Sequence, residues 1–221
     1  MNKKQNYFKH AIVLFLLLLL MQPGRAWAAY ENVEFSSLTN HDGLTNSQVR
    51  AILKDTRGYI WFGTQSGLCR FDGFRMKTFY YSNTDDKSLP NNTVDEIQQD
   101  YDGNIWVHTS VGYSIYKYDE EQFDRKPEEW LKNIHVQGPP YKLLIDKDKN
   151  MWIAVYGQGL YYHNAKTKNT YLFKFTKKAQ PGCLKEGNIS KITEVDGDAL
   201  ITYDDGTICR VNGQKQKVLW Y

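Results

Sequence analysis

Short apolar segments separated by polar turns recur along most of the chain. Residues 49–54, 59–64, 68–71 and 75–81 combine β-branched and aromatic side chains, and Gly- or Asp-containing turns lie between them. Apolar segments of about four to eight residues between such turns are typical of antiparallel strands. This succession predicts a four-stranded sheet in which each strand pairs with the next.

The same pattern returns at a nearly constant spacing. Its three clearest copies are residues 55–62 (DTRGYIWF), 100–107 (DYDGNIWV) and 146–153 (DKDKNMWI). The steps from Trp61 to Trp106 and from Trp106 to Trp152 are 45 and 46 residues. A period of about 40–50 residues with short strands and glycine turns is typical of propeller blades. We therefore predict an all-β fold, a partial β-propeller of three to four four-stranded antiparallel blades.

The period also sets approximate blade boundaries. They fall at about residues 44–88, 89–135, 136–182 and 183–221. The fourth repeat is degenerate, with Leu200 in the place of the tryptophan, and nothing in it indicates ring closure. We therefore expect an open arc of blades, preceded by an orphan strand at about residues 31–37.

At two places the sequence departs from the repeat, and each departure predicts a local change in structure. The insertion 119–133 contains the segment 127–131 (PEEWL), which predicts a short helix at the outer edge of the second blade. In the third repeat, Lys149 replaces the turn glycine and Asn150 follows it. Because Asn tolerates a left-handed backbone better than Lys does, we expect this turn to shift by one residue.

The recurring tryptophans have a structural explanation. A blade has two apolar faces, and each face needs a neighbouring blade to cover it. A large flat side chain on an inner strand buries about 150–250 Å² against such a neighbour. Trp61, Trp106 and Trp152 are therefore predicted to form the core between blades rather than a platform for a ligand.

Residues 1–28 have the layout of a secretory signal peptide. Lys3, Lys4 and Lys9 precede an unbroken apolar run at 11–21, and an A-x-A cleavage signal ends at Ala28. A retained membrane anchor is the alternative. However, eleven apolar residues give only about 16 Å of helix, whereas a bilayer core is about 30 Å thick. We expect the remaining residues, 29–221, to form the propeller in the periplasm.

Removing this leader changes the charge and bears on the cysteines. It carries four basic residues and no acidic one, which leaves 24 basic against 25 acidic residues and a net charge of −1 in place of +3. Nucleic-acid binding is therefore not predicted. The odd set of Cys69, Cys183 and Cys209 allows at most one intrachain bridge. Cys69 and Cys209 take similar places in two repeats, as expected for small apolar residues on buried strands.

The candidate catalytic and metal-binding groups do not form a recognisable constellation. Residues 146–150 (DKDKN) begin like a calcium loop, but Met151 and Gly157 occupy the positions that need Gly and Glu. The Asp204–Asp205 pair reads as part of a hairpin turn. The histidines at 41, 108, 135 and 163 lack metal-ligand spacing and a nucleophile partner. The sequence predicts no catalytic residue, no metal and no cofactor.

Ligand-binding residues are sought on one face of the propeller, where first strands begin and second strands turn into third strands. Amide, hydroxyl and phenol groups there can hydrogen-bond a sugar, and aromatic rings can stack on it. The candidates are Asn46, Gln65, Asn91, Asn92, Ser110, Tyr113, Tyr156 and Gln158. For Asn46 and Asn91 the alternative role is to cap the turns that start the first strands.

Three segments resemble the two-component regulator propeller repeat. They are residues 42–49 (DGLTNSQV), 55–64 (DTRGYIWFGT) and 67–73 (GLCRFDG). The resemblance covers residues 30–124 strongly and continues to Tyr171. It implies a hybrid two-component sensor whose periplasmic part is two seven-bladed propellers and a small β-sandwich. A membrane helix, a histidine kinase, a receiver for the phosphorelay and often a DNA-binding domain follow, and the family commonly senses oligosaccharides.

On this resemblance, the chain is expected to be an N-terminal periplasmic input module without catalysis of its own. The implied partners are an oligosaccharide ligand and the remaining blades and domains of the full-length sensor, which is anchored in the inner membrane and forms a homodimer. One alternative is a secreted glycan lyase or hydrolase, which requires convergent carboxylates about 5–10 Å apart. A structural propeller scaffold is another.

Overall fold

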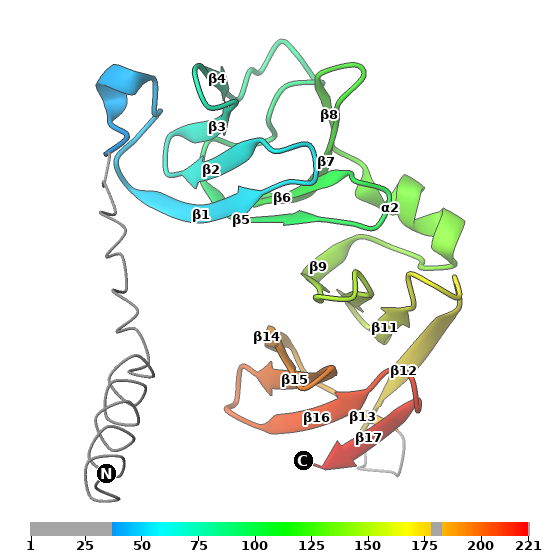
Figure 1. Cartoon of the computed structure of the whole chain (residues 1–221). Helices are drawn as coiled ribbons and strands as arrows, with labels where there is room; N and C mark the ends of the chain where they lie inside the picture. Colours follow the sequence, from blue (N-terminus) through cyan, green and yellow to red (C-terminus); the bar gives the residue numbers. More distant parts are fainter. Residues whose placement is uncertain (1–36, 178–182, 221) are drawn as a thin grey trace, which may run out of the picture. The chain divides into compact units, whose positions relative to one another are not determined.

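The computed structural model describes residues 37–177 and 183–220, and β-strands dominate them (Figure 1). Residues from Leu38 onward belong to one compact unit. The predicted signal peptide and most of the predicted orphan strand lie outside the described residues. Within these ranges, no helix is both long and apolar enough to cross a bilayer.

The first two sheets are regular four-stranded meanders. The first contains β1 (Val49–Lys54), β2 (Ile60–Thr64), β3 (Gly67–Phe71) and β4 (Met76–Phe79). The second contains β5 (Val94–Gln99), β6 (Ile105–Thr109), β7 (Gly112–Lys117) and β8 (Gln122–Asp124). In both sheets each strand pairs antiparallel with the next one along the chain.

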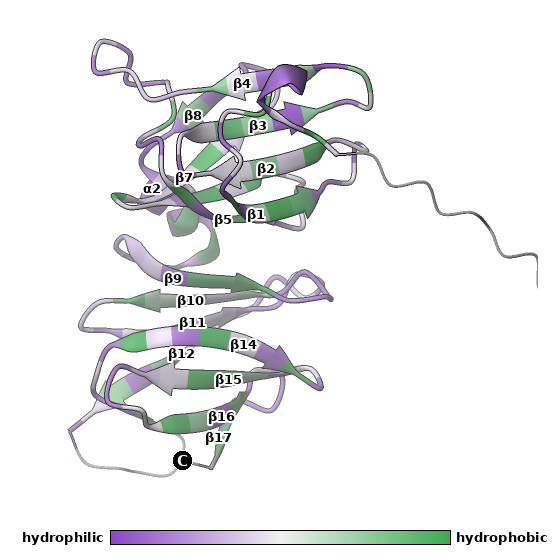
Figure 2. Cartoon of the chain, turned by 90° about the vertical axis from the view of Figure 1, so that its left-hand side faces the viewer, coloured by the Kyte–Doolittle hydropathy of each residue, from purple (hydrophilic) through white to green (hydrophobic). Residues whose placement is uncertain are grey.

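The third and fourth sheets repeat this plan. The third contains β9 (Pro140–Ile145), β10 (Met151–Val155), β11 (Gly159–His163) and β12 (Thr170–Thr176), and β13 (Leu184–Lys185) adds a short parallel strand. The fourth contains β14 (Ile189–Val195), β15 (Asp198–Tyr203), β16 (Ile208–Asn212) and β17 (Lys217–Trp220). The all-β fold of tandem blades predicted from the sequence is confirmed. Figure 2 shows hydrophobic residues along the strands and hydrophilic residues at many turns.

Within residues 37–177 and 183–220, helical structure is limited to short segments. They are η1 (Asn40–Asp42), α2 (Pro127–Leu131) and η2 (Lys132–Ile134). The short helix predicted within the insertion of the second blade is thus present. It begins at Pro127, whose fixed φ and missing N–H suit the first turn of a helix.

A carboxylate fixes the turn before each tryptophan. Asp55 Oδ1 accepts hydrogen bonds from the backbone N–H groups of Arg57 and Tyr59, and Asp55 Oδ2 accepts one from Trp61 Nε1 at 2.6 Å. The indole of Trp106 donates to Asp100 at 2.8 Å, and that of Trp152 to Asp146 at 3.4 Å. The first residue of the sequence motif therefore ties the turn to an indole six residues later.

The turn of the third blade corrects one prediction. Lys149 itself adopts the left-handed conformation, with φ +64°, at the position of Gly58 and Gly103, so the turn does not shift. Asp146 Oδ1 accepts from the backbone N–H groups of Asp148 and Asn150, as in the other two turns, and this pattern needs a left-handed residue between them. Lys149 Nζ also donates to the carbonyl of Gln99 in the second blade at 3.0 Å.

Three hydrophobic clusters join the sheets in sequence order. Trp61 packs against Tyr116 of the second blade with ring centroids 5.1 Å apart, and Trp106 packs against Trp130 of α2 at 5.4 Å. Trp152 lies in the cluster that joins the third and fourth blades. All three indoles are at most 1% exposed. Among the described residues no cluster joins the first sheet to the fourth, so the row of sheets is unclosed.

The two outer sheets keep apolar residues that are only partly covered. Ile52 of β1 is 66% exposed, and Leu200, in the place of the tryptophan, is half-buried. The neighbouring Ala199 and Ile201 point into the cluster shared with the third blade. Cys69 and Cys209 are buried free thiols, and burial raises the pKa of Cys209 to about 11.

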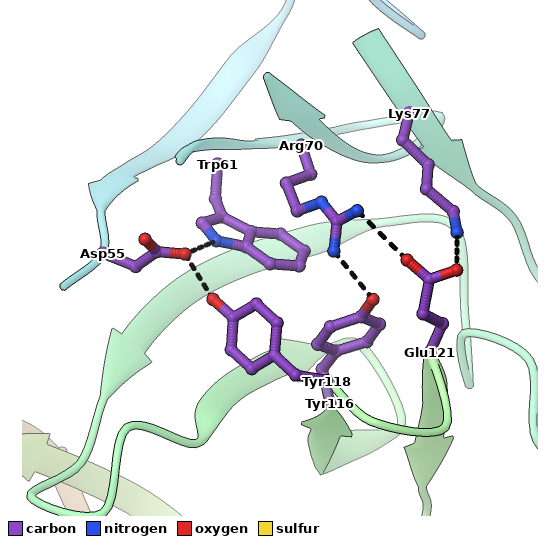
Figure 3. A network of polar contacts seen from close by, with 7 residues as sticks. All are labelled: Asp55, Trp61, Arg70, Lys77, Tyr116, Tyr118 and Glu121. Carbon is purple, nitrogen blue, oxygen red and sulfur yellow. Dashed lines mark hydrogen bonds and ion pairs between the residues drawn. The ribbon is translucent and has the colours of Figure 1, made fainter. Parts of the chain in front are cut away.

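A polar network fills the seam between the first and second blades (Figure 3). Arg70 of β3 donates to the hydroxyl of Tyr116 at 3.0 Å and to the carboxylate of Glu121 at 3.1 Å. Lys77 of β4 contacts the same carboxylate. Lys77 and Arg70 together hold the pKa of Glu121 below its usual value. These contacts cross from one blade to the next at their outer strands.

The inner end of the same seam is held by Asp55. Besides the indole of Trp61, its carboxylate accepts a hydrogen bond from the hydroxyl of Tyr118 in the second blade (Figure 3). Burial, with a contribution from Asp55, raises the pKa of Tyr118. The Arg57 guanidinium lies 3.8 Å from the centroid of the Tyr118 ring. One carboxylate thus orders both a turn within its own blade and a contact to the next.

Candidate functional site

Most candidate side chains predicted from the sequence are at one end of the sheets. Antiparallel strands alternate in direction, so the starts of β1, β5, β9 and β14 share an end with the turns between second and third strands. We call this end the entrance face. Ser110, Tyr113 and Tyr156 line one hollow there, of about 420 Å³, between the second and third blades. The structure therefore brings three predicted residues together.

A stacked pair of tyrosines forms the wall of this hollow. The rings of Tyr141, from β9, and Tyr156, from the β10–β11 turn, lie 4.0 Å apart at 17°. Tyr156 is 64% exposed, whereas the hydroxyl of Tyr141 accepts the backbone N–H of Ile189 in the fourth blade at 3.2 Å. One ring is thus anchored between blades and holds the other, which faces solvent.

A second hollow of about 340 Å³ lies on the other side of this tyrosine pair. Its lining is Tyr141, Lys142, Tyr156, Asn188, Ile189, Ser190 and Asp204. Because both tyrosines line both hollows, the two hollows adjoin across an aromatic saddle, and we treat them together as one groove. We call it the saddle groove. Hollows of this size lined by aromatic and a few polar groups are typical of ligand sites.

The floor of the first hollow is built from buried polar groups. The hydroxyl of Tyr113 accepts the backbone N–H of Leu143 at 3.0 Å and donates to Glu96 at 3.3 Å. Burial is the main cause that raises the pKa of Tyr113, followed by the charge of Glu96. Burial also lowers the pKa of His108, whose ring lies 4.4 Å from that of Tyr113. Burial thus favours the neutral form of the His108 ring, and its Nδ1 has no hydrogen-bond partner among the described residues.

The outer wall of the hollow is set by Arg125 and α2. The Arg125 guanidinium donates to the backbone carbonyls of Asp85, Ser88 and Leu89 at 3.0–3.2 Å. This guanidinium therefore fixes the loop that joins the first blade to the second. Helix α2 starts two residues later and brings Glu128 to the rim of the hollow. Within the described ranges, no three His, Cys, Asp or Glu residues are grouped so that they could hold a metal ion.

Of the other five predicted ligand residues, four use their side chains in hydrogen bonds within the protein. The side-chain oxygens of Asn46 and Asn91 accept the backbone N–H two residues on, at 2.7 and 2.8 Å, so both cap turns. Asn92 accepts the N–H of Tyr81 at 2.7 Å, and Gln158 donates to the carbonyl of Gln137 at 2.8 Å. Gln65 is exposed on the first blade. A ligand-binding role for these five stays a prediction.

Sequence reasoning missed Tyr141, Asn188 and Ser190. Each lies where the first strand of a blade begins, as do Asn46 and Asn91. In the first two blades a Leu-x-Asn segment marks the start of the first strand. The third and fourth blades lack this segment, so this motif did not indicate where their first strands begin. The position of Tyr141 directly after Pro139 and Pro140 was the available signal for a strand start.

Tandem four-stranded antiparallel blades with a groove on the entrance face define this protein as a β-propeller segment. The model of the family described as "Two component regulator propeller" matches residues 43–66 and 88–110. Both matches run from the lead-in of a blade to its second-to-third-strand turn. The chain therefore carries two-component regulator propeller repeats in its first two blades.

Two known proteins are similar to this chain. "Histidine kinase P4" of Formosa agariphila is 36% identical over 78 residues, which are 35% of this chain and 5% of that protein. The crystal structure of the extracellular domain of the hybrid two component system BT3049 from B. thetaiotaomicron superposes with a TM-score of 0.58 at 23% identity. That match covers 84% of this chain and 26% of the solved chain. The chain thus spans a small part of both relatives, and the structural likeness shows the fold.

Proposed function

We propose that this chain is a ligand-input segment of a two-component sensor, exposed in the periplasm, and that it binds an oligosaccharide in the saddle groove. The observation that carries the proposal is the tyrosine pair: an exposed ring, Tyr156, held parallel to an anchored one, Tyr141, between two hollows. The family repeats and the two relatives, a histidine kinase and the extracellular domain of a hybrid two-component system, support a role in signal input.

The chemistry of the groove suits a sugar chain. An exposed aromatic face can stack on the C–H face of a pyranose ring, with gains comparable to other aromatic contacts. Ser110 supplies a hydroxyl on one side of the saddle, and Asn188 supplies a carboxamide on the other. The Ser190 hydroxyl donates to the Thr202 carbonyl at 3.0 Å and is left as an acceptor. Together these groups offer donors and acceptors, as sugar hydroxyls do. The groove therefore favours a chain of several sugar units that crosses the saddle over a single monosaccharide.

The proposed mechanism is differential binding. The saddle groove is lined by three successive blades, the second, third and fourth. An oligosaccharide that contacts all three favours the arrangement of blades that fits it over other arrangements. In a full-length sensor this preference for one arrangement of blades would reach the kinase through the domains that lie between the propeller and the kinase. The segment itself supplies binding free energy and no chemical step.

A catalytic role finds little support in the same groove. Glycoside hydrolysis generally needs two carboxyl groups on either side of one bond. The first hollow has one carboxylate in its lining, Glu128, and the second has one, Asp204. These acids lie in different blades, beyond opposite sides of the tyrosine pair. We therefore favour binding over hydrolysis.

The test is calorimetric titration of the chain with neutral oligosaccharides of one to six units, such as the malto-, cello-, xylo- and manno-series. We expect at least one series to bind, with affinity that rises with chain length. Tyr156→Ala should weaken that binding about tenfold or more, because it removes the exposed ring of the saddle. Tyr80→Ala is the matched control, since Tyr80 is a half-exposed tyrosine on the first blade.

Two outcomes contradict the proposal. One is an absence of heat and of any thermal-shift response with every glycan tested. The other is a glycan whose affinity is the same for the Tyr156→Ala variant and the unaltered chain. A bound ligand at a hundredfold excess over its Kd raises stability by about 2.7 kcal/mol, which a thermal shift detects readily.

A further inference from the structure

A hollow larger than either hollow of the saddle groove lies away from the entrance face. Its volume is about 640 Å³, and it lies between the third and fourth blades at the opposite end of their strands. Three hairpin turns form it: β9–β10, β11–β12 and β16–β17. We call it the distal groove. It shares no lining residue with the saddle groove.

The floor of the distal groove is rigid and aromatic. The Tyr162 ring, 5% exposed, packs at a tilt of 49° against Trp152 with centroids 4.5 Å apart, and its hydroxyl accepts from Asn164 at 3.2 Å. Gly213 lies against this ring so closely that a Cβ there would come within 2.5 Å of it. Only glycine permits this close approach of the β16–β17 turn to the ring.

The wall next to this floor is held in place by hydrogen bonds of buried and half-buried asparagine side chains. Asn150 is 6% exposed, donates to Asp146 at 3.1 Å and accepts the backbone N–H of Ala165 at 3.0 Å. The carboxamide of Asn164 accepts the N–H groups of Lys166 and Thr167 and so holds the β11–β12 turn. The turns around the groove are thus ordered by side chains beneath them, so a ligand there meets a preformed surface.

The rim, by contrast, carries polar groups that the protein does not use. The side chains of Asn169, Gln214 and Gln216 are exposed, and among the described residues none of them makes a hydrogen bond within the chain. Asp148 and Lys166 add one charge of each sign. Carboxamides offer both donors and acceptors, and the opposite charges balance, so the rim selects for hydroxyl groups and against net charge.

We propose that the distal groove is a second carbohydrate-binding site, specific for uncharged polyhydroxylated chains. The class of ligand follows from the rim carboxamides above an aromatic floor. The proposal does not depend on binding at the saddle groove. Two sites at opposite ends of the strands of blade three would let one propeller segment hold two stretches of a glycan or two separate chains.

The test is NMR titration of the whole chain with maltohexaose, cellohexaose, xylohexaose and mannohexaose, read at the backbone amides of residues 164–169 and 213–216. We expect one of them to shift these signals. The double variant Asn169→Ala/Gln214→Ala should weaken that response about tenfold, since it removes two rim hydrogen-bonding groups. Gln65→Ala is the matched control, because it truncates an exposed carboxamide on the first blade.

The Tyr156→Ala variant separates this proposal from the one for the saddle groove. If the distal amides still respond in that variant and lose their response in Asn169→Ala/Gln214→Ala, the distal site is supported whatever the saddle groove does. The proposal is overturned if none of the four hexasaccharides shifts the distal amides. It is also overturned if the double variant, with an unchanged thermal midpoint, responds as the unaltered chain does.

Discussion

The seam between the first and second blades and the seam between the third and fourth are built differently from the same repeat. In the first, Asp55 binds an indole and a tyrosine hydroxyl, and Arg70, Lys77 and Glu121 continue the network across the blades. In the other, Asp146 binds Trp152 at 3.4 Å, and a hollow opens at each end.

The difference shows how one motif can serve both stability and binding. The tryptophan covers the neighbouring blade in both seams, and this apolar burial holds the row of sheets together. Where charged and phenolic side chains fill the space beyond the indole, the seam is closed. Where small residues such as Gly213 and exposed turns surround it, grooves remain that a ligand can enter.

The largest expected effect is the loss of a buried indole. Trp61→Ala should lower the free energy of unfolding by about 3–5 kcal/mol, because it removes apolar contact and leaves a cavity between two blades. Leu200→Ala, at the equivalent but half-buried position of the fourth blade, should cost about 1 kcal/mol. Urea unfolding followed by tryptophan fluorescence and circular dichroism measures both. Equal costs would show that the indole is not the residue that joins the blades.

The second largest effect is expected when the carboxylate that accepts the indole N–H is removed. Asp55→Ala leaves the Trp61 indole, the Tyr118 hydroxyl and two backbone N–H groups without their acceptor, and should cost about 2–3 kcal/mol. Asp146→Ala should cost less, because the bond from Trp152 is long and the other side-chain donor to Asp146 comes from its own turn, Asn150, rather than from the next blade. Thermal unfolding of both variants ranks them. A larger loss for Asp146→Ala would contradict the contrast between the seams.

A smaller effect is expected in the turns. Gly58 has φ +92° and open space around the position of a Cβ, so Gly58→Ala should cost about 1 kcal/mol through backbone strain alone. Lys149→Gly should relieve similar strain in the third blade, but it loses the hydrogen bond from Lys149 Nζ to the Gln99 carbonyl. These two effects on the free energy of unfolding have opposite signs and should nearly cancel. A large stabilisation by Lys149→Gly would mean that this bond between blades contributes nothing.

The smallest effect concerns pH. Lys77 and Arg70 lower the pKa of Glu121 in the folded state below the ordinary value of 4.5, so its contribution to stability is present above that pH and is lost as the pH falls through the folded pKa. At pH 7, Glu121→Gln should cost less than about 1 kcal/mol, since the carboxylate is 47% exposed and solvent screens its ion pairs. The difference between variant and unaltered chain should vanish in acid. A difference that persists at a pH below the folded pKa of Glu121 would exclude this carboxylate as its cause.

Several residues of the candidate site could be predicted from the sequence, but the way they come together in one hollow could not. Ser110, Tyr113 and Tyr156 were predicted from their places in the turns, and they line one hollow. Tyr141 was missed because the third blade lacks the lead-in that marks the strand starts of the first two. The left-handed Lys149 was also missed, because residue preference alone favoured Asn150 and the hydrogen bonds of Asp146 overrode that preference.

The sequence by itself determined the repeat: its period, its strands, its turns and the place of each indole, because hairpin pairing and apolar spacing are local in the chain. Only the tertiary structure decided which seams close and which leave grooves. That outcome depends on side chains from separate blades, such as Tyr141 with Tyr156 or Tyr162 with Gly213, that meet only after the sheets have packed.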